Sequence, residues 1–379
     1  MQQVLFRIPI PLPGLGLPNG IPIYGFGAML FVAFILCTWL AGRRAQKEGV
    51  GRELIQDLAM WLLLGGLIGA RLSSVLLEGI RTGKVDMNLF WQFFRIWDGG
   101  LILYGSIIGG IIAYFLAYYF VIRRRNVSTW KMADIIAVAV VVGIGVGRIG
   151  CYLNGCCYGG VACPSCQFQA HFPLSSPPRF ALVHDGYQTP AGFTIEPTDD
   201  AALVKAVEPD SEAAAAGLKT GDAIVAIRNF RASGDTEAIT SRDSINNAFA
   251  ADWPRGKNSL ELTVKRAGQE IDLAKIAPKT LGLHPTQLYE TISMLLLFFL
   301  LTAYWPFRRR DGEVAALMMF CYGLHRSLNE LLRDDARPVA FEKYISIFLI
   351  VAGLVLFIYR RRTPVQQTVA EPAAASATA

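Results

Sequence analysis

The sequence predicts an α-helical polytopic membrane protein with about seven transmembrane helices and one small inserted α+β domain. Of the 379 residues, 53% are hydrophobic and 17% are charged, which is too apolar for a soluble chain of this length. The apolar residues form runs of about 20, the length that crosses the ~30 Å hydrocarbon core of a bilayer. Lysines and arginines stand at the ends of these runs, so the formal net charge of +6 indicates membrane topology and no nucleic-acid partner.

Seven apolar runs, four before the inserted domain and three after it, are predicted to span the membrane. In chain order they cover residues 21–41, 56–78, 99–122, 134–153, 288–305, 313–332 and 344–359. A cleavable signal peptide would carry its basic residues before the first run and a small-residue cleavage site after it. Here Arg43, Arg44 and Lys47 follow the run, so we interpret it as a span.

Basic clusters after every second span set the expected orientation. They are Arg43, Arg44, Lys47 and Arg52 after the first span, Arg123, Arg124, Arg125 and Lys131 after the third, Arg308, Arg309 and Arg310 after the fifth, and Arg360, Arg361 and Arg362 after the seventh. Short basic loops favour the cytoplasm. The N-terminus is therefore expected outside, the C-terminus in the cytoplasm, and the long segment between spans four and five outside.

The composition between the spans divides the chain into five parts. They are residues 1–160 with transmembrane helices 1–4, 161–192 as an exported segment rich in Cys and Pro, 193–277 as the inserted domain, 278–362 with helices 5–7, and 363–379 as a disordered cytoplasmic tail. In the insert, alternating apolar residues predict strands at 201–207, 223–228 and 259–265. Between the first two, Ser211 is expected to cap a short helix that Gly217 ends.

Two stretches of the insert, "SEAAAAGLKTGDAIVAI" and "LELTVKRAGQ", resemble a PDZ domain of the kind attached to bacterial envelope proteases. PDZ domains bind extended peptides by adding a strand to a sheet edge. The resemblance therefore implies an extracytoplasmic peptide or protein ligand. No clear Gly-rich carboxylate loop precedes Leu203, so a spacer that has kept the fold without the ligand is an equal alternative.

Five of the seven cysteines lie at or beyond the outer end of span four. They are Cys151, Cys156, Cys157, Cys163 and Cys166. An exported, oxidising setting favours disulfides there. The CxxC spacing of the last two is also typical of a redox motif or of half a zinc site, but no second CxxC and no paired histidines accompany it. The sequence favours a structural disulfide or free thiols, and we predict no metal site and no cofactor.

Arginines inside the predicted spans indicate an anionic ligand. A charged residue at the bilayer centre costs on the order of 3 kcal/mol on insertion scales, so each one needs a partner. Arg71 lies in span two and Arg148 near the outer end of span four, where snorkelling to a headgroup is one explanation. Glycines at positions 143, 145, 147 and 150 leave room for a helix or a lipid headgroup to approach Arg148.

Span six carries a second ionisable group, His325, Arg326, Glu330 and Arg333. The last three recur at i, i+4 and i+7, which places them on one helix stripe. An ion pair between Arg326 and Glu330 is one interpretation, but it leaves positive charge in the helix unbalanced. With Arg148, these arginines predict a phosphate clamp, because guanidinium matches phosphate oxygens bidentately.

Six segments in this order resemble the prolipoprotein diacylglyceryl transferase family: "IPIYGFG", "GGLIGARL", "DGGLILYGSIIGG", "GRIGCYLNGCCYGG", "HPTQLYE" and "YGLHRSLNELLRDD". The resemblance covers nearly all of the chain outside the insert. It implies a multi-pass protein of the bacterial cytoplasmic (inner) membrane that acts on phosphatidylglycerol and prolipoprotein signal peptides. In the implied reaction, the thiol of the lipobox cysteine attacks the glyceryl carbon that bears the phosphate. A thioether forms and glycerol phosphate leaves, which is the first step of lipoprotein maturation.

The family's functional residues carry over position by position. Arg148 and Arg326 match its catalytic arginines. Many members have a histidine and two glycines where this chain has Tyr104-Gly105-Ser106. The group that helps the thiol lose its proton is expected to be Tyr104, a catalytic candidate, or His325. Tyrosine, with a reference pKa near ~10, is a poor base at neutral pH, so a role for Tyr104 in orienting the substrate alone is the alternative. The implied substrate-binding residues are Arg148, Tyr24, Asn154, Glu330, Arg333, Gly99, Gly100, His284 and Gln287, the last two with a structural capping role as an equal alternative.

Two other functions fit parts of the pattern. A transporter or receptor for an anionic ligand would explain buried arginines and glycines, but not the series of motifs. An intramembrane protease would suit a PDZ-like domain, but the chain has no HExxH and no GxSxG. The sequence therefore favours the transferase.

Overall fold

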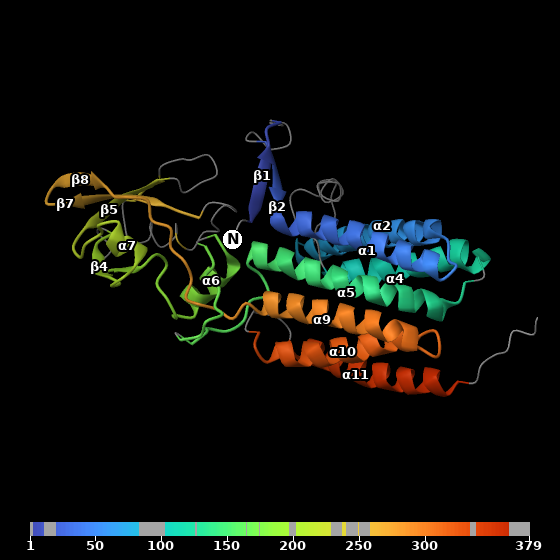
Figure 1. Cartoon of the computed structure of the whole chain (residues 1–379). Coiled ribbons are helices and arrows are strands. Elements are labelled where there is room, and N and C mark those ends of the chain that lie inside the picture. Colours follow the sequence, from blue (N-terminus) through green and yellow to red (C-terminus); the bar gives the residue numbers. More distant parts are fainter. Residues whose placement is uncertain are drawn as a thin grey trace, which may run out of the picture.

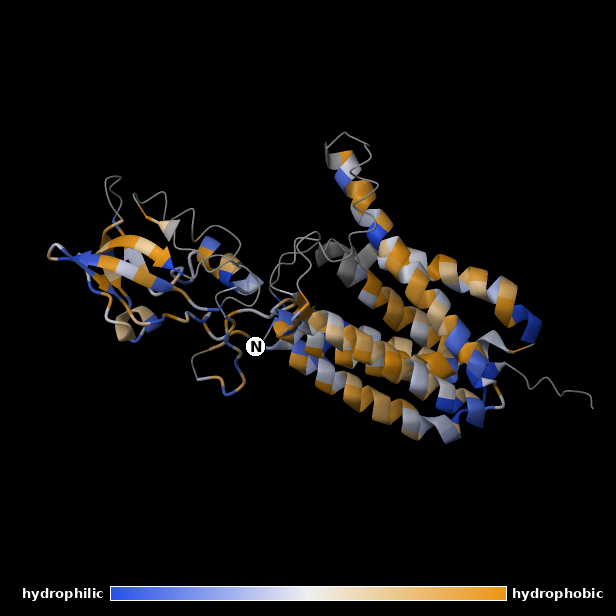
Figure 2. Cartoon of the chain, turned by 90° about the horizontal axis from the view of Figure 1, so that it is seen from above, coloured by the Kyte–Doolittle hydropathy of each residue, from blue (hydrophilic) through white to orange (hydrophobic). Residues whose placement is uncertain are grey.

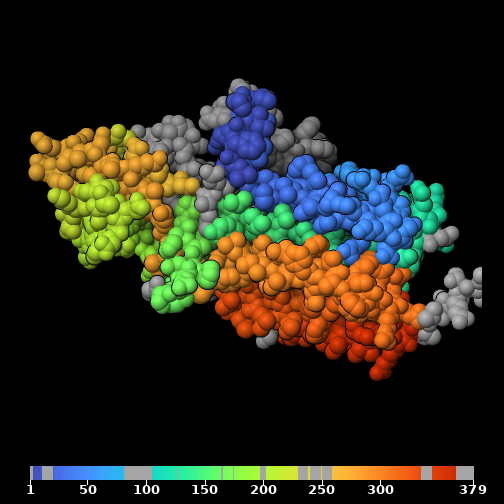
Figure 3. All heavy atoms as spheres, viewed as in Figure 1, coloured from blue at the N-terminus to red at the C-terminus, as the bar shows by residue number. Residues whose placement is uncertain are grey.

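The computed structural model shows a helical bundle with a small β-rich body at one end (Figure 1). It describes residues 3–10, 20–82, 103–125, 127–163, 165–173, 175–196, 202–228, 237–239, 249, 258–333 and 339–363. In the space-filling view the body forms a lobe of its own, which joins the bundle through the segment that follows α5 (Figure 3).

Seven long helices of the described chain build the bundle and run side by side (Figure 1). They are α1 (Gly25–Lys47), α2 (Arg52–Thr82), α4 (Leu103–Ala117, continued by the turns η3 Tyr118–Ile122 and η4 Arg123–Arg125), α5 (Thr129–Asn154), α9 (Thr286–Tyr304, continued by η5 Trp305–Phe307), α10 (Glu313–Glu330) and α11 (Val339–Arg362). Six of them are long and apolar enough to cross a membrane, which confirms a multi-span protein. The exception is α10, because its 18 residues include the charged Glu313, Arg326 and Glu330.

The outer surface of the bundle is apolar. Figure 2 shows hydrophobic residues along the helices and hydrophilic ones gathered at the helix ends away from the β-rich body. Large side chains on different helices point outward, for example Phe31, Phe115, Leu296 and Phe348, each more than 60% exposed. Water-soluble proteins rarely expose so large an apolar area, so lipid is the natural solvent of this face.

Helix α5 lies at the centre of the bundle and is the most buried of the candidate spans. Its glycines let the neighbouring helices approach closely. An ideal Cβ at Gly150 would stand 3.0 Å from Met29 Cβ on α1, and one at Gly145 would stand 3.3 Å from Met294 Cβ on α9. The sequence left open whether a helix or a lipid headgroup approaches these glycines. At Gly145 and Gly150 it is a helix.

A second glycine contact, between α2 and α4, is tighter. Gly65 and Gly69 of α2 face Gly105 and Gly109 of α4, and each pair is spaced four residues apart, which places both members on one helix face. An ideal Cβ at Gly69 would overlap the carbonyl oxygen of Gly105, and one at Gly109 would overlap that of Gly65. The two helix backbones therefore touch along this seam.

Three of the basic clusters meet at the bundle end opposite the β-rich body (Figure 1). Arg308 Nη2 lies 2.5 Å from Glu48 Oε2, and Trp305 Nε1 donates to Glu48 Oε1 at 2.9 Å. Burial of Glu48 opposes these contacts, yet they hold the pKa of its carboxyl below the ordinary value. At the same end Arg360 Nε donates to the carbonyl of Asp311 at 2.7 Å. The ends of α1, α9 and α11 are thus tied together.

The first predicted span was wrong at its start. Residues Ile21–Tyr24 form strand β2, which pairs antiparallel with β1 (Val4–Ile8) in the register Ile8↔Ile21. The helix begins only at Gly25, whose N–H donates to the carbonyl of Gln3 at 2.8 Å. Tyr24 is therefore the residue before a helix and not a residue within a span. Its apolar neighbours gave the helical signal, but the partner strand decided the structure.

The insert contains one four-stranded antiparallel sheet in the order β6-β5-β7-β8 and one two-stranded sheet, β3-β4. The strands are β3 (Phe193–Ile195), β4 (Val204–Val207), β5 (Ala223–Arg228), β6 (Glu237–Ala238), β7 (Glu261–Arg266) and β8 (Gln269–Asp272). Thus β4, β5 and β7 confirm the three predicted strands. Ser211 caps the short helix α7 (Glu212–Ala215) as predicted, by accepting from Ala214 N at 3.1 Å. A core around Val204, Ile227 and Leu262 lies between these elements.

The segment between bundle and insert is itself folded. Gln3 Nε2 donates to the carbonyls of Asn154 and Ser175, both at 3.1 Å, and Ser175 Oγ donates to Asn258 Oδ1 at 2.8 Å. Arg179 lies buried on α6 (Pro177–His184) and donates to the carbonyl of Phe249 at 3.4 Å. Burial lowers the pKa of Arg179 to about 10. These contacts connect the hairpin, the end of α5 and the insert.

Candidate active site

The site lies at the bundle end that faces the insert, where α5 ends (Figure 1). The helix stops at Asn154 because Gly155 adopts a left-handed φ of 78°, and the Gly155 N–H donates to the carbonyl of Cys151 at 2.9 Å. Such a glycine cap reverses the chain direction. Cys156 and Cys157 therefore return over the last turns of α5, beside Arg148.

Arg148 forms an ion pair with Glu290 of α9. The distance from Nε to Oε2 is 2.8 Å, and the glutamate side chain is 1% exposed. Asn329 of α10 donates from Nδ2 to the same oxygen at 3.2 Å. Three helices thus meet at one carboxylate. A buried ion pair in an apolar setting is stable only when geometry and hydrogen bonds are good, and here they fix the guanidinium in place.

Arg326 brings a second guanidinium to this region. Its Nη2 lies 3.9 Å from Glu330 Oε2, one helix turn away, and each side chain is 13% exposed. Tyr322 and His325, on the same helix, both lie within electrostatic reach of Arg148, Arg326 and Glu290. The arginines of α5 and α10 therefore share one neighbourhood, as the phosphate-clamp interpretation requires.

Three cysteine thiols occupy the same end of α5. The sulfur atoms of Cys151, Cys156 and Cys157 all lie within 4.8 Å of one another. Arg148 Nη1 is 4.0 Å from the sulfur of Cys151. Hydrogen bonds from the other two thiols, opposed by burial and aided by the charges of Arg148 and Arg333, hold the pKa of Cys157 below that of an ordinary thiol.

Comparison with known proteins identifies the family of this chain. The family model for prolipoprotein diacylglyceryl transferase matches residues 15–359. The chain belongs to the prolipoprotein diacylglyceryl transferase family.

Similar family members come from distant bacteria. A phosphatidylglycerol–prolipoprotein diacylglyceryl transferase of Rhodopirellula baltica is 28% identical over 408 residues, covering 96% of this chain and 78% of the relative. Proteins of the same name from Clostridium tetani and an Enterobacter species are 24% and 25% identical. They cover 94% and 92% of this chain, and 97% and 92% of their own lengths. These alignments therefore include nearly all of this chain.

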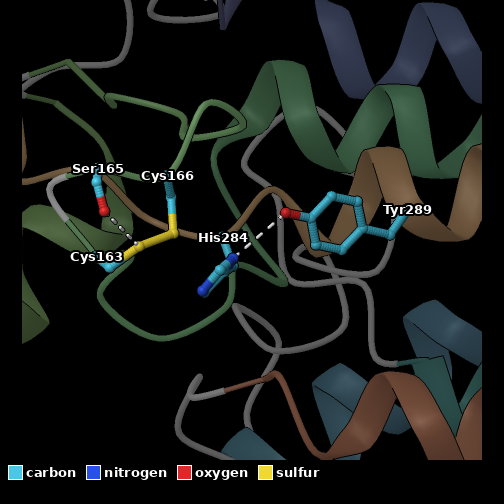
Figure 4. The surroundings of a disulfide bond; sticks show 5 residues. All are labelled: Cys163, Ser165, Cys166, His284 and Tyr289. Atoms are coloured by element: carbon cyan, nitrogen blue, oxygen red, sulfur yellow. Dashed lines mark hydrogen bonds between the residues drawn. A yellow bond between two sulfur atoms is a disulfide. The ribbon is translucent and has the colours of Figure 1, made fainter.

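The HPTQLYE segment of this family member holds the loop that follows α5 and contains Cys156 and Cys157, here called the returning loop. Gln287 Nε2 donates to the carbonyl of Cys156 and Thr286 Oγ1 to that of Cys157, both at 2.7 Å. His284 Nδ1 lies 3.3 Å from the hydroxyl of Tyr289 (Figure 4). These contacts are what a structural role predicts for Gln287 and His284.

The five cysteines at and beyond the end of α5 divide into two groups. Cys163 and Cys166 form a disulfide, drawn in Figure 4, which decides between the disulfide and the free thiols that the sequence left open for this pair. Cys151, Cys156 and Cys157 are free thiols.

Arg333 does not lie on the stripe predicted for span six. Helix α10 ends at Glu330, and the chain then forms a bridge in which Arg333 pairs with Gly159. The Gly160 N–H donates to the carbonyl of Leu332 at 3.1 Å. Pairing with the returning loop replaces the last helical turn, so Arg333 reaches the neighbourhood of Cys157 by another route.

The structure describes the other expected site residues to different extents. Gly99 and Gly100 lie outside the described residues, and Tyr104 is described only as part of the backbone of α4. Tyr24, 36% exposed, ends β2 at the site's end of the bundle. Asn154 is the last residue of α5, and its carbonyl accepts from Gln3.

From the sequence, Glu290 was not expected as the partner of Arg148, and Asn329 was not expected at the site. The signal for Glu290 was present, because a carboxylate inside an apolar run requires a partner just as an arginine does. Asn329 gave no comparable signal, since an amide beside Glu330 also fits a helix end.

Proposed function

We propose that this chain transfers the diacylglyceryl group of phosphatidylglycerol to the lipobox cysteine of prolipoproteins, with Arg148 and Arg326 holding the phosphate. Membership of the family makes the chain a transferase. One observation supports these roles above all. Arg148 is fixed by the buried carboxylate of Glu290, and both Arg148 and Arg326 lie near Tyr322.

The chemistry requires stabilisation of a leaving phosphate. As the thiol sulfur attacks the glyceryl carbon, the carbon–oxygen bond breaks and negative charge gathers on the phosphate ester oxygen. Preorganised donors aimed at such developing charge are a major source of catalysis. Two guanidinium groups from different helices suit this task, because each can form two parallel hydrogen bonds to phosphate oxygens.

We also propose a membrane topology. We count α10 as the sixth of seven spans along the chain, because it runs within the bundle beside α9 and α11 (Figure 1). The bundle end that carries the arginine clusters is assigned to the cytoplasm. In the bacterial inner membrane, the N-terminus, the insert and the active site then lie outside, and the C-terminus lies in the cytoplasm.

The insert is proposed to be a PDZ-like domain that recruits or orients partners outside the membrane. The short capped helix α7 between β4 and β5, and the antiparallel strands around it, support this assignment. A peptide would add to an edge of the sheet. Every residue assigned to chemistry lies outside residues 193–277.

The deciding experiment incubates the purified full-length protein with phosphatidylglycerol and a lipobox peptide and analyses the peptide by mass spectrometry. A diacylglyceryl adduct on the cysteine, absent from a peptide with serine at that position, is the expected result. Binding of phosphatidylglycerol without any adduct would favour the anion transporter or receptor instead.

A further inference from the structure

The three-thiol cluster of Cys151, Cys156 and Cys157 has no part in the phosphate clamp. Cys151 is buried at the end of α5, and the other two thiols are half-buried on the returning loop. The neighbouring Cys163 and Cys166 have joined in a disulfide, whereas these three sulfurs remain thiols within 4.8 Å of one another.

The cluster is held by the protein from several directions. Thr286 and Gln287, at the start of α9, bind the backbone carbonyls of Cys157 and Cys156. The backbone of Cys157 has a φ of 60°. Few residues other than glycine, asparagine and aspartate adopt this left-handed conformation. Another helix thus fixes a loop conformation that turns the three sulfurs toward one another.

Three sulfur donors at this spacing suit a thiophilic cation. A Zn–S bond of about 2.3 Å in a tetrahedral site separates the sulfurs by roughly 3.8 Å, so the cluster needs only a small contraction. Three thiolates and one divalent zinc leave a single negative charge. Arg148 lies 4.0 Å from the sulfur of Cys151, and Arg333 pairs with Gly159, two residues beyond Cys157. Two guanidinium groups thus stand near two anions, Glu290 and the zinc–thiolate cluster, which favours the site in an environment of low dielectric constant.

We propose that Cys151, Cys156 and Cys157 bind one zinc ion whose fourth position receives the lipobox thiol. The inference rests on the proposed function and supplies what Tyr104 does not, because a thiol that coordinates a metal loses its proton. Catalytic zinc sites typically have three protein ligands and one open position.

The step balances in atoms and charge. The substrate sulfur bonds to zinc and releases its proton to water. That sulfur then attacks the glyceryl carbon, a C–S bond forms, and the C–O bond breaks with its electron pair on the phosphate oxygen. The neutral thioether is a weaker zinc ligand and leaves, and the site regains its open position. Attack opposite the leaving oxygen requires thiol and phosphate sites close to one carbon, and Arg148, the proposed phosphate ligand, lies 4.0 Å from the sulfur of Cys151.

The first test measures metal in the full-length protein purified without chelators. We expect about one zinc per chain, detected by elemental mass spectrometry, and loss of that zinc in each of Cys151→Ser, Cys156→Ser and Cys157→Ser. Cys321→Ser, which changes a thiol on α10, is the matched control and should keep it. Equal metal in the wild type and in all three folded variants, or a disulfide within the cluster of the active protein, would overturn the inference.

The second test uses only the wild-type protein, so its result does not depend on whether the cysteine variants fold. Cobalt(II) added to the metal-free wild-type protein should give the intense near-ultraviolet absorption of cobalt–thiolate bonds. A lipobox peptide should change that absorption, and the same peptide with serine in place of cysteine should not. Absence of the band, or equal response to both peptides, counts against the site or its open position. Transfer is assayed separately by mass spectrometry, so full activity of the metal-free protein would refute the zinc ion and leave the proposed function standing.

Discussion

Arg148 of α5 and Glu290 of α9 are joined by an ion pair of 2.8 Å in which the carboxylate is 1% exposed. The pair connects the GRxG segment to the HPTQLYE segment, which lie on opposite sides of the insert in the sequence. Its position explains why both segments are needed to build one site.

Removal of either clamp arginine should abolish transfer. For Arg148→Ala or Arg326→Ala we expect a loss of at least about 10²–10³-fold in kcat/KM, the range seen when one donor to a developing oxyanion is removed. Lysine should restore little at either position, because it cannot form the bidentate fork. Arg124→Ala, an exposed arginine at the other end of the bundle, is the control. Near-normal turnover in either alanine variant, measured by mass spectrometry, would refute the clamp.

Glu290→Gln tests whether the carboxylate positions Arg148. The amide keeps the size and one acceptor but removes the charge that balances the guanidinium. We expect a smaller loss than in Arg148→Ala, seen mainly in kcat with KM for phosphatidylglycerol less affected. A parallel measurement of thermal stability in detergent separates misplacement from unfolding. If Glu290→Gln is fully active, the ion pair has no positioning role.

Tyr104→Phe should keep measurable activity. If the ring only orients the lipid, loss of the hydroxyl removes one hydrogen-bonding group and leaves the aromatic contact. Turnover and lipid binding are measured together. Complete loss of turnover with binding intact would show that the hydroxyl transfers a proton, and Tyr104→His would then test the residue that many family members have.

Excision of residues 193–277 should leave transfer to a short lipobox peptide largely intact. The two sides of the insertion point lie close together, since Leu281 N donates to Gln188 Oε1 at 2.8 Å. A short Gly/Ser linker can therefore join them. Transfer to full-length prolipoproteins is expected to fall, because lost tethering lowers the effective concentration. A correctly inserted, folded deletion protein that cannot modify even the short peptide would show that the insert shapes the active site.

The insert should lose stability in acid through Asp222. Two hydrogen bonds from Arg266, at 2.7 and 2.6 Å, hold the pKa of this carboxyl below its usual range, against burial. The stabilisation is therefore present above the unfolded pKa of about 3.9 and is lost as the pH falls through the lower folded pKa. Hydrogen exchange of the β5 and β7 amides in the full-length protein measures this effect. Asp222→Asn should remove the pH dependence, and the exposed Glu270→Gln should not.

Much of the fold could be predicted because apolar length alone determines a span. Every predicted span except the sixth ends within helical structure that extends beyond the apolar run, as in α2, which begins at Arg52 instead of residue 56. Polar helix ends lie outside the hydrocarbon and carry no hydropathy signal. The β1–β2 hairpin was missed for a related reason, since a strand is fixed by a partner that local pattern does not reveal.

The site was predictable only one residue at a time. Charge inside a span identified Arg148 and Arg326, because burial of an unpartnered charge is so unfavourable. Which groups meet depends on contacts between distant segments. The Arg148–Glu290 pair, the bridge that draws Arg333 off its helix, and the convergence of three thiols behind Gly155 all depend on how the loop after α5 returns. No spacing in the sequence encodes that return.

The glycine seam between α2 and α4 limits which amino-acid substitutions these two helices can tolerate. At Gly65, Gly69, Gly105 and Gly109 even one added methyl group meets neighbouring atoms, so a library randomised there should return a single amino acid. Leu72, one turn from the seam and 55% exposed to lipid, should accept almost any apolar replacement. Selection should therefore keep glycine at the positions where α2 and α4 touch and accept many apolar residues at the lipid-facing positions of the same helices.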